Sequence, residues 1–331
     1  MRLGKWGTTA AAAAVIVAGS VVTADARAES AVRASRSYEP RDEGGGQAPA
    51  RFAAEFDNRI IVVSAETGRP ERYLTDVKPG GGASRPAVSP DGRVVFFSRG
   101  DGSCAAHLAS VPVTGGKEQK VPGSGEAGPE TVPLPRPGQA QLAFARIDCE
   151  KPDSALIVGD LGGLEGRGQP GLVPLDWSRD GSHLLARRAL SGETRLLDVN
   201  KSGGIVADNP LEPPDTVKDC RLKVVGFSPD DNDGYVAIRR CGPSDERGRR
   251  SLVLLGQDGN LRKTVVRLAR NQDFTDRPAF DRTGHSLLYS TVPAEADDNT
   301  GNNPVSLWLW RDGESRRLGR QTGLSHYVWL P

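Results

Sequence analysis

The chain has 331 residues, and its 43 Lys and Arg nearly balance its 42 Asp and Glu. This balance argues against a basic protein that binds nucleic acid and against an acidic tail. The chain contains 40 Gly and 24 Pro but a single Met. Such a turn-rich composition, with few stretches of helical period, favours an all-β protein.

Residues 1–28 have the layout of a secretory signal peptide. Arg2 and Lys5 come first, an uncharged run over 8–22 follows, and small residues surround Ala26 and Ala28. The run is shorter than the ~20 apolar residues that a spanning helix needs. We therefore expect cleavage after Ala26 or Ala28, no membrane span after cleavage, and a secreted or extracytoplasmic location in the periplasm or cell-wall space. An uncleaved membrane anchor is the alternative.

Residues 29–55 are predicted to be a flexible linker. They are polar, include the run Arg41-Asp42-Glu43-Gly44-Gly45-Gly46, and hold few large apolar side chains that could offset the entropy of ordering. Residues 56–331 remain for the folded domain.

One turn motif recurs along this domain and indicates repeats. Pro presets φ in such a turn, Asp bonds its own backbone, and Gly adopts the positive φ that closes a hairpin. The glycines at 92, 138, 181, 234 and 284 are 46, 43, 53 and 50 residues apart, which is the period of propeller blades. The copies are Ser89-Pro90-Asp91-Gly92, Leu134-Pro135-Arg136-Pro137-Gly138, Trp177-Ser178-Arg179-Asp180-Gly181, Phe227-Ser228-Pro229-Asp230 with Gly234, and Phe280-Asp281-Arg282-Thr283-Gly284.

Each motif precedes a short apolar strand, such as residues 94–98 (VVFFS), and a second Gly-marked hairpin follows. Two hairpins per repeat make four antiparallel strands, which is one blade. There are six second hairpins but five complete first hairpins, so the last inner strand must come from residues 325–331 (SHYVWLP). We predict a six-bladed β-propeller of four-stranded antiparallel blades, closed by the C-terminal strand. Residues 51–56 are a candidate for the fourth strand of the composite blade.

The segment Pro86-Ala87-Val88-Ser89-Pro90-Asp91-Gly92 resembles the WD40-like (PD40) repeat of the TolB-like family. The resemblance recurs in weaker form over residues 56–331 and implies a propeller fold. The same repeat is found in periplasmic assembly proteins and in the propeller domains of some serine peptidases. TolB itself carries an α/β domain before its propeller, and residues 29–55 are too short to form one.

Motifs that would indicate a metal, a cofactor or catalysis are weak in this sequence. Gly166-Arg167-Gly168-Gln169-Pro170-Gly171 has dinucleotide-loop spacing, but a strand rather than a helix is predicted after it. The four histidines, His107, His183, His285 and His326, lack the local pairing of zinc ligands. No Gly-x-Ser-x-Gly elbow is present. We therefore expect no cofactor and no metal, with Ca²⁺ at 230–234 or 297–302 as a weaker alternative.

Four Cys in an exported chain predict two disulfides. Cys220 precedes one strand of a hairpin and Cys241 follows the other, so antiparallel pairing sets them side by side. Cys104 and Cys149 occupy matching loop positions in adjacent blades and form the second pair by subtraction.

From the absence of a catalytic motif we expect a monomeric protein-binding scaffold without enzymatic activity. The alternatives are a hydrolase or lyase with its site near the central channel, and a carbohydrate-binding or sensory module. Function inferred from a fold is an analogy. The identity of the protein partner does not follow from the sequence.

Strand direction places the binding surface of this scaffold. The recurring turns share one end of the ring, whereas the long connections over 76–84, 122–131, 241–250 and 292–303 share the other. Long loops on a rigid scaffold are where binding residues usually lie. The polar groups expected to meet a partner there are Asp245, Glu246, Arg247, Arg249, Arg250, Glu295, Asp297 and Asp298.

Overall fold

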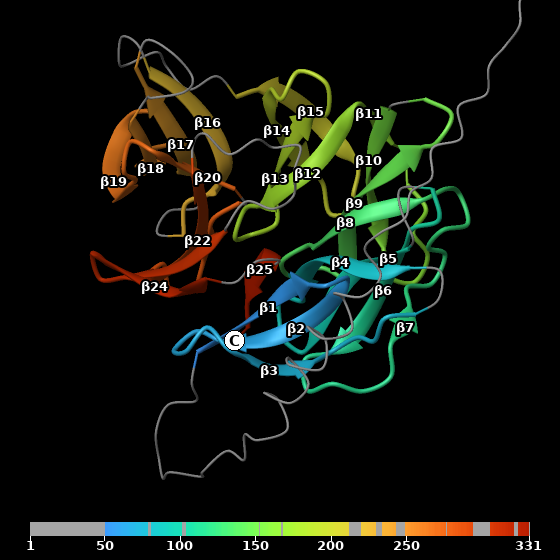
Figure 1. Cartoon of the computed structure of the whole chain (residues 1–331). Helices are drawn as coiled ribbons and strands as arrows, with labels where there is room; N and C mark the ends of the chain where they lie inside the picture. The colour runs from blue at the N-terminus through green and yellow to red at the C-terminus, as the bar shows by residue number, and fades with distance from the viewer. Residues whose placement is uncertain are drawn as a thin grey trace, which may run out of the picture. The chain divides into compact units, whose positions relative to one another are not determined.

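The structure is a computed structural model that describes residues 50–78, 81–100, 104–151, 153–166, 168–211, 220–229, 234–242, 249–275, 277–293, 305–320 and 324–330. The described strands form six antiparallel sheets, which are the blades of a propeller (Figure 1). The predicted fold class is therefore confirmed. The predicted signal peptide and residues 29–49 of the predicted linker lie outside the described part of the chain.

We number the blades in chain order, with each inner strand first. Blade 1 consists of β25 (Leu324–Trp329), β1 (Arg51–Phe56), β2 (Arg59–Ser64) and β3 (Pro70–Tyr73). Blade 2 consists of β4 (Gly82–Val88), β5 (Val94–Gly100), β6 (His107–Pro112) and β7 (Gln119–Lys120). Blade 3 consists of β8 (Glu130–Pro135), β9 (Gln141–Asp148), β10 (Asp153–Asp160) and β11 (Gln169–Pro170).

The remaining blades follow the same meander. Blade 4 consists of β12 (Leu172–Trp177), β13 (His183–Arg188), β14 (Thr194–Val199) and β15 (Ile205–Pro210). Blade 5 consists of β16 (Cys220–Phe227), β17 (Tyr235–Cys241), β18 (Arg249–Leu255) and β19 (Leu261–Arg267). Blade 6 consists of β20 (Gln272–Phe274) and β21 (Ala279–Phe280), which both pair β22 (Ser286–Pro293), then β23 (Ser306–Arg311) and β24 (Glu314–Arg320).

The recurring turns are built as their residues predict. The Ser89 hydroxyl donates to Asp91 Oδ1 over 2.6 Å, and Gly92 has φ 74°. The turn of blade 4 repeats this with Ser178, Asp180 and Gly181, again at 2.6 Å. A left-handed φ favours glycine because a side chain there would be strained. These contacts explain why Ser, Asp and Gly recur at the turns of blades 2 and 4.

Hydrophobic residues are buried between neighbouring blades rather than in one common core. Six clusters occur, one for each adjacent pair around the ring, such as Leu185 of blade 4 with Val224 of blade 5. The cluster between blades 6 and 1 includes Leu288, Phe52 and Trp329. Each blade is therefore held by both of its neighbours, and blade 1 is held by blades at both ends of the domain sequence.

Strand β25 closes the ring by pairing with β1, where Phe52 lies opposite Trp329. Residues 51–56, the candidate for the missing strand of the composite blade, form β1, which lies second in the blade beside β25. The propeller therefore begins at Arg51 rather than at residue 56. Residues Phe52, Ala53 and Ala54 of β1 are fully buried. Small and polar neighbours concealed this strand in the sequence.

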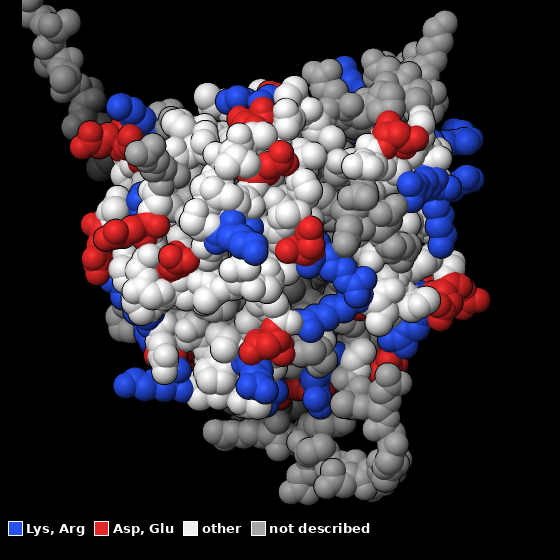
Figure 2. Space-filling model, turned by 180° about the vertical axis from the view of Figure 1, so that it is seen from behind, with Lys and Arg blue, Asp and Glu red and all other residues white. Residues whose placement is uncertain are grey.

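The two ends of the ring differ. We call the end with the recurring turns and second hairpins, such as 89–92 and 200–204, the short-turn end. We call the opposite end, where connections such as 57–58, 76–81 and 149–151 lie, the long-loop end. Figure 2 shows the ring from the side opposite to Figure 1, and over that face basic and acidic side chains are interspersed.

Candidate functional site

The inner strands meet around the ring axis, and all six are irregular at the same level. Pairing with the second strand slips between Ser84 and Ala87 in blade 2, and slips also occur in blades 1, 3, 4 and 5. In blade 6 the inner strand is divided into β20 and β21. Bulges of this kind redirect side chains and are common beside functional sites.

Three of these bulges contain a non-glycine residue in the left-handed region. Arg85 has φ 54°, Val132 has φ 56° and His326 has φ 47°. This conformation is uncommon for residues with a side chain and is costly for a β-branched one. Strained backbone therefore recurs at equivalent positions around the axis.

Glu55 of β1 stabilises two of these residues. Its Oε2 accepts a hydrogen bond from the Arg85 backbone N–H over 3.1 Å and lies 2.9 Å from Nδ1 of His326. Burial raises the pKa of the Glu55 carboxyl, but the hydrogen bonds and charges of His326 and Arg85 together outweigh it, and the net pKa lies below the usual 4.5. Glu55 is therefore an ionised acceptor that holds β25 and β4 in place.

A second acidic residue connects three inner strands near the axis. Asp176 of blade 4 pairs with Arg277 of blade 6 over 2.8 Å, and its other oxygen accepts the backbone N–H of Phe227 in blade 5 over 2.9 Å. Blades 4 and 6 are not neighbours, so this ion pair spans the inner strand of blade 5 beside Gly226. Gly226 permits this because a Cβ there would lie 2.9 Å from Asp176 Oδ2.

Further cations approach the axis toward the long-loop end. Partial burial lowers the pKa of Arg187, and the charges of Arg85 and Arg277 lower it further. Partial burial also lowers the pKa of Lys223, Arg187 and Arg240 add to this, and Asp273 acts in the opposite direction. Arg85, Arg187 and Arg277 belong to alternate blades, 2, 4 and 6, and such residues can influence one another only near the axis.

We call this group the axial cluster. Among the described residues no carboxylate forms an ion pair with the side chains of Arg85, Arg187 or Lys223. Within the described residues the cluster holds four basic side chains, Arg85, Arg187, Lys223 and Arg277, and two carboxylates, Glu55 and Asp176, while the charge of Asp273 acts on Lys223 from outside it. Its members are Glu55, Arg85, Asp176, Arg187, Lys223, Arg277 and His326.

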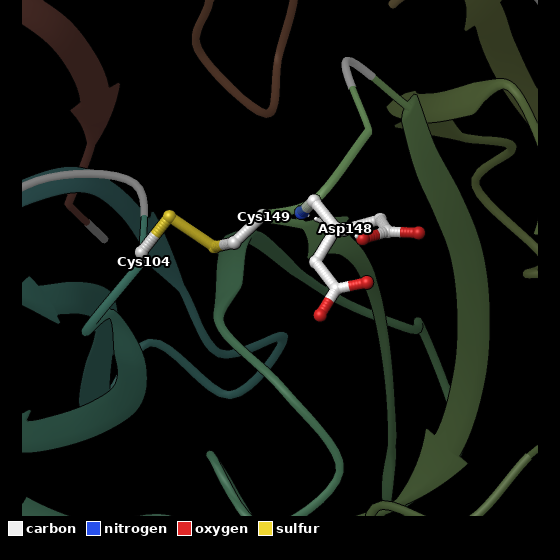
Figure 3. The surroundings of a disulfide bond; sticks show 4 residues. Cys104, Asp148 and Cys149 are labelled. Atoms are coloured by element: carbon white, nitrogen blue, oxygen red, sulfur yellow. Dashed lines mark hydrogen bonds between the residues drawn. A yellow bond between two sulfur atoms is a disulfide. The ribbon is translucent and has the colours of Figure 1, made fainter.

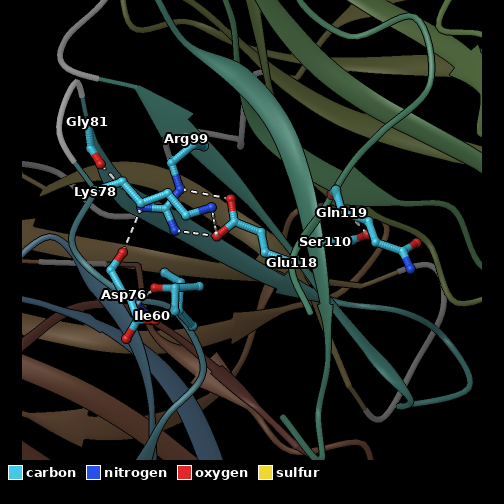
Figure 4. Close-up of polar contacts among 9 residues, drawn as sticks. Ile60, Asp76, Lys78, Gly81, Arg99, Ser110, Glu118 and Gln119 are labelled. Carbon is cyan, nitrogen blue, oxygen red and sulfur yellow. Dashed lines mark hydrogen bonds and ion pairs between the residues drawn. The ribbon is translucent and has the colours of Figure 1, made fainter. Parts of the chain in front are cut away.

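At the long-loop end, the connection between β3 and β4 is held by the buried side chain of Arg99 (Figure 4). The Arg99 guanidinium donates to the carbonyls of Asp76 and Gly81 over 3.1 and 3.2 Å. It also pairs with Glu118 at 2.6 Å, and Lys78 pairs with the same carboxylate at 3.0 Å. The connection between β3 and β4 is thereby held on blade 2.

Both disulfides are present and both pairings were predicted correctly. Cys104–Cys149 joins the loops of blades 2 and 3 (Figure 3), and Cys220–Cys241 joins β16 to β17. Cys220 lies directly opposite Cys241 in the strand register, as expected from antiparallel pairing. All four cysteines lie at the long-loop end. Disulfides are typical of an oxidising, extracytoplasmic compartment.

Two of the predicted binding residues fall on described chain. Arg249 begins β18 and is exposed. Arg250 is only 4% exposed, and its guanidinium lies 2.9 Å from Asp273, which also pairs with Arg240. Arg250 thus stabilises the base of the loop and does not face solvent, which corrects its predicted role. The others, Asp245, Glu246, Arg247, Glu295, Asp297 and Asp298, lie outside the described residues, as do most of the two candidate Ca²⁺ segments.

A Ser, a His and an Asp meet at the short-turn end. Ser182 Oγ lies 2.7 Å from Nδ1 of His183, and Nε2 lies 3.3 Å from Asp198. However, the Ser182 hydroxyl also donates to Asp180 over 2.7 Å. Its one proton is thereby committed to a carboxylate whose pKa lies at about 2, so His183 does not activate the hydroxyl as a base would. We assign these residues to turn structure.

Other sequence motifs can now be placed. The glycine-rich segment at 166–171 leads into strand β12, so it lacks the helix that a dinucleotide loop needs. Within the described residues there is no group of three His, Cys, Asp or Glu suited to a metal. The same part of the chain includes no helix long and apolar enough to cross a membrane.

Sequence reasoning missed the axial cluster. Its cations come from four blades and share no local spacing, so no motif search could collect them. A weak signal existed in the Arg85-Pro86 and Val132-Pro133 pairs, since each proline follows the left-handed residue of an inner-strand bulge. Aligning the repeats on their turns would have placed these pairs at the axis.

Comparisons with known proteins agree on the fold. No protein-family model and no curated protein matches the chain. A protein provisionally named TolB from Agrobacterium tumefaciens is similar over 86% of this chain and 98% of its own, with 15% identity and a TM-score of 0.57. An oligogalacturonate lyase from Vibrio parahaemolyticus is similar over 82% and 74%, with 16% identity and a TM-score of 0.50. A prolyl endopeptidase matches over 91% of this chain and 54% of its own, with 14% identity and a TM-score of 0.49.

These similarities correct one expectation. We inferred the absence of enzymatic activity from the absence of a catalytic motif, and that inference is wrong, because the propeller fold found here is shared with enzymes such as the lyase. A propeller can bring together side chains from several blades, as in the axial cluster, and a site built in this way leaves no contiguous motif.

Proposed function

We propose that the chain is an exported TolB-like propeller that binds a protein partner at the long-loop end of its ring. The observation that carries this proposal is that three features coincide at that end. Both disulfides fix its loops, the longest connections lie there, and the cations of the axial cluster lie toward it. A rigid scaffold with stabilised loops is suited to recognition.

The proposal is tested by shortening two loops. Residues 243–248 and 294–303 are each replaced by a short Gly-Ser link, and capture of a partner from the native envelope or culture fluid is measured with the melting temperature. We expect capture to be lost while the melting temperature changes little, because surface loops contribute little to stability.

Arg93 and Arg179 provide the matched control at the short-turn end. Arg93 is 85% exposed and Arg179 is also exposed, so replacing each with Ser should leave capture intact. Arg282 is unsuitable as a control because it donates to the carbonyls of Ser89 and Pro90 across the closing blade. Capture that survives loop replacement but fails in the Arg93 and Arg179 variants would place the binding surface at the short-turn end and contradict the proposal.

A second candidate function is that of an enzyme with its site at the axis. The Glu55–His326 pair favours it, since a carboxylate that holds one ring nitrogen leaves the other available for proton transfer. Incubation with oligogalacturonate, the substrate in the name of the similar lyase, tests one such reaction. Product that forms with the natural chain and not with the His326→Gln variant supports this candidate, and no product from either argues against it.

A further inference from the structure

The axial cluster brings several cations together without enough acidic partners. Arg277 is paired with Asp176, and Glu55 is occupied by His326 and by a backbone N–H. That leaves Arg85, Arg187 and Lys223 as the cations for which the described residues supply no ion-paired carboxylate. Folding gathers like charges here at an energetic cost, which a purely structural site would avoid.

The cluster is also accessible and has a defined depth. Arg85 is exposed, and the side chains of Arg277 and His326 are each 39% exposed. In the strand register Arg187 lies opposite Val173, whereas Asp176 lies three residues further toward the short-turn end. The Asp176–Arg277 pair thus lies nearer the short-turn end, and Arg187 lies nearer the long-loop end.

The arrangement of the cations indicates the chemistry of a ligand. They come from separate blades around the axis and do not converge on one point as a backbone cradle for a single phosphate does. Guanidinium groups bind carboxylates through paired hydrogen bonds, and Lys adds a point charge. His326 offers a further ring nitrogen near the Arg85 backbone, because Glu55 Oε2 contacts both residues.

We propose that the axial cluster is a binding site for a ligand that carries several carboxylate groups, held by Arg85, Arg187 and Lys223. This site goes beyond the proposed function, because a small polycarboxylate needs no protein partner. The carboxylates can belong to a free small molecule or to the acidic side chains of a peptide. Perturbed titratable groups and strained backbone at one place support a functional origin.

The test is calorimetric titration of the mature chain with citrate at low ionic strength, with acetate as a monovalent control. We expect citrate to bind more tightly than acetate and to weaken as salt is added. The double variant Arg187→Gln, Lys223→Gln should lose at least tenfold in citrate affinity, whereas Arg93→Gln, Arg179→Gln at the short-turn end should bind as the natural chain does.

The melting temperature separates a ligand site from a structural one. Removing two mutually repelling cations should leave the melting temperature unchanged or raise it. A lower melting temperature with unchanged citrate binding would assign Arg187 and Lys223 to structure and overturn the proposal.

A hexaglutamate peptide distinguishes the two sources of carboxylate. Binding of citrate indicates a small-molecule ligand, and binding of the peptide alone indicates acidic side chains of a partner, while both support the site. If neither binds more tightly than acetate, the proposal is wrong, whether or not partner capture at the long-loop end succeeds.

Discussion

Arg136 joins blades 3 and 4 through one buried guanidinium. It donates to the carbonyls of Gly181, Asn200 and Val199 at 2.8, 2.7 and 2.9 Å, and it lies over the ring of Trp177. Burial lowers the pKa of this arginine, which is only 3% exposed. One side chain therefore satisfies three backbone carbonyls in two turns of blade 4.

Replacing Arg136 with Met should destabilise the protein by about 3 kcal/mol, because several buried carbonyls lose their donor at once. Urea unfolding measures the loss. The exposed Arg179→Met variant serves as the control and should unfold at the natural midpoint. Equal midpoints for the two variants would show that the buried contacts contribute no stability.

Asp180 should make stability depend on pH in the acid range. Hydrogen bonds from Ser178 and Ser182 lower the pKa of this carboxyl from 3.8 to about 2. The folded pKa is the lower one, so the contribution is present above pH 4 and is lost as pH falls from 3.8 through 2. The group is largely exposed, and solvent screening reduces the effect to below about 1 kcal/mol.

The measurement is the melting temperature of the natural chain and of Asp180→Asn between pH 5 and pH 2. The difference between the two should shrink as pH falls, since protonation removes the same charge that the substitution removes. A difference that stays constant over this range would argue against the assigned hydrogen bonds as its source.

At the scale of elements, the disulfides stabilise two different kinds of connection. Cys220–Cys241 spans 21 residues within one hairpin, whereas Cys104–Cys149 spans 45 residues and links two blades. Closing a longer loop removes more entropy from the unfolded chain. Replacing each pair with Ser should cost about 3 and about 4 kcal/mol respectively in the chain-entropy estimate.

Thermal unfolding of the two double-Ser variants checks this order. Peptide mapping of the non-reduced natural chain provides the control that both pairs form. If the loss of Cys104–Cys149 had no effect on the melting temperature, blades 2 and 3 would be held by their shared hydrophobic cluster alone.

The elements were largely predictable, because each depends on local chemistry. Ser89, Asp91 and Gly92 make a turn through contacts within a few residues, so the repeat and the strand pairs that it joins could be predicted from spacing. Strand β1 was harder, since its burial depends on β25 at the other end of the chain. The axial cluster was beyond sequence reasoning because Arg85 and Arg187 belong to blades 2 and 4, and the charge of one acts on the other only in the folded ring.

At the scale of the whole molecule, the ring depends on its C-terminal strand. Tyr327 and Trp329 of β25 pack on Phe52, and the Trp329 indole donates to the Ala279 carbonyl over 2.8 Å. Deleting residues 325–331 would expose two strand edges and open the cluster between blades 6 and 1.

We expect this deletion to lower the melting temperature strongly or to prevent folding. The milder Trp329→Ala variant should fold and lose about 3 to 5 kcal/mol, as expected for a large buried aromatic. A deletion variant with the same melting temperature as the natural chain would contradict closure through β25.

Binding of the partner at the long-loop end is tested most directly by lysine acetylation of the complex. Lys78 and Lys151 are exposed at the long-loop end, whereas Lys117 and Lys201 are exposed in hairpins at the short-turn end. Mass spectrometry compares the acetylation rate of each lysine with and without the partner. We predict slower acetylation of Lys78 and Lys151 in the complex and unchanged rates for Lys117 and Lys201. Protection of Lys117 and Lys201 instead, with Lys78 and Lys151 unchanged, would contradict it.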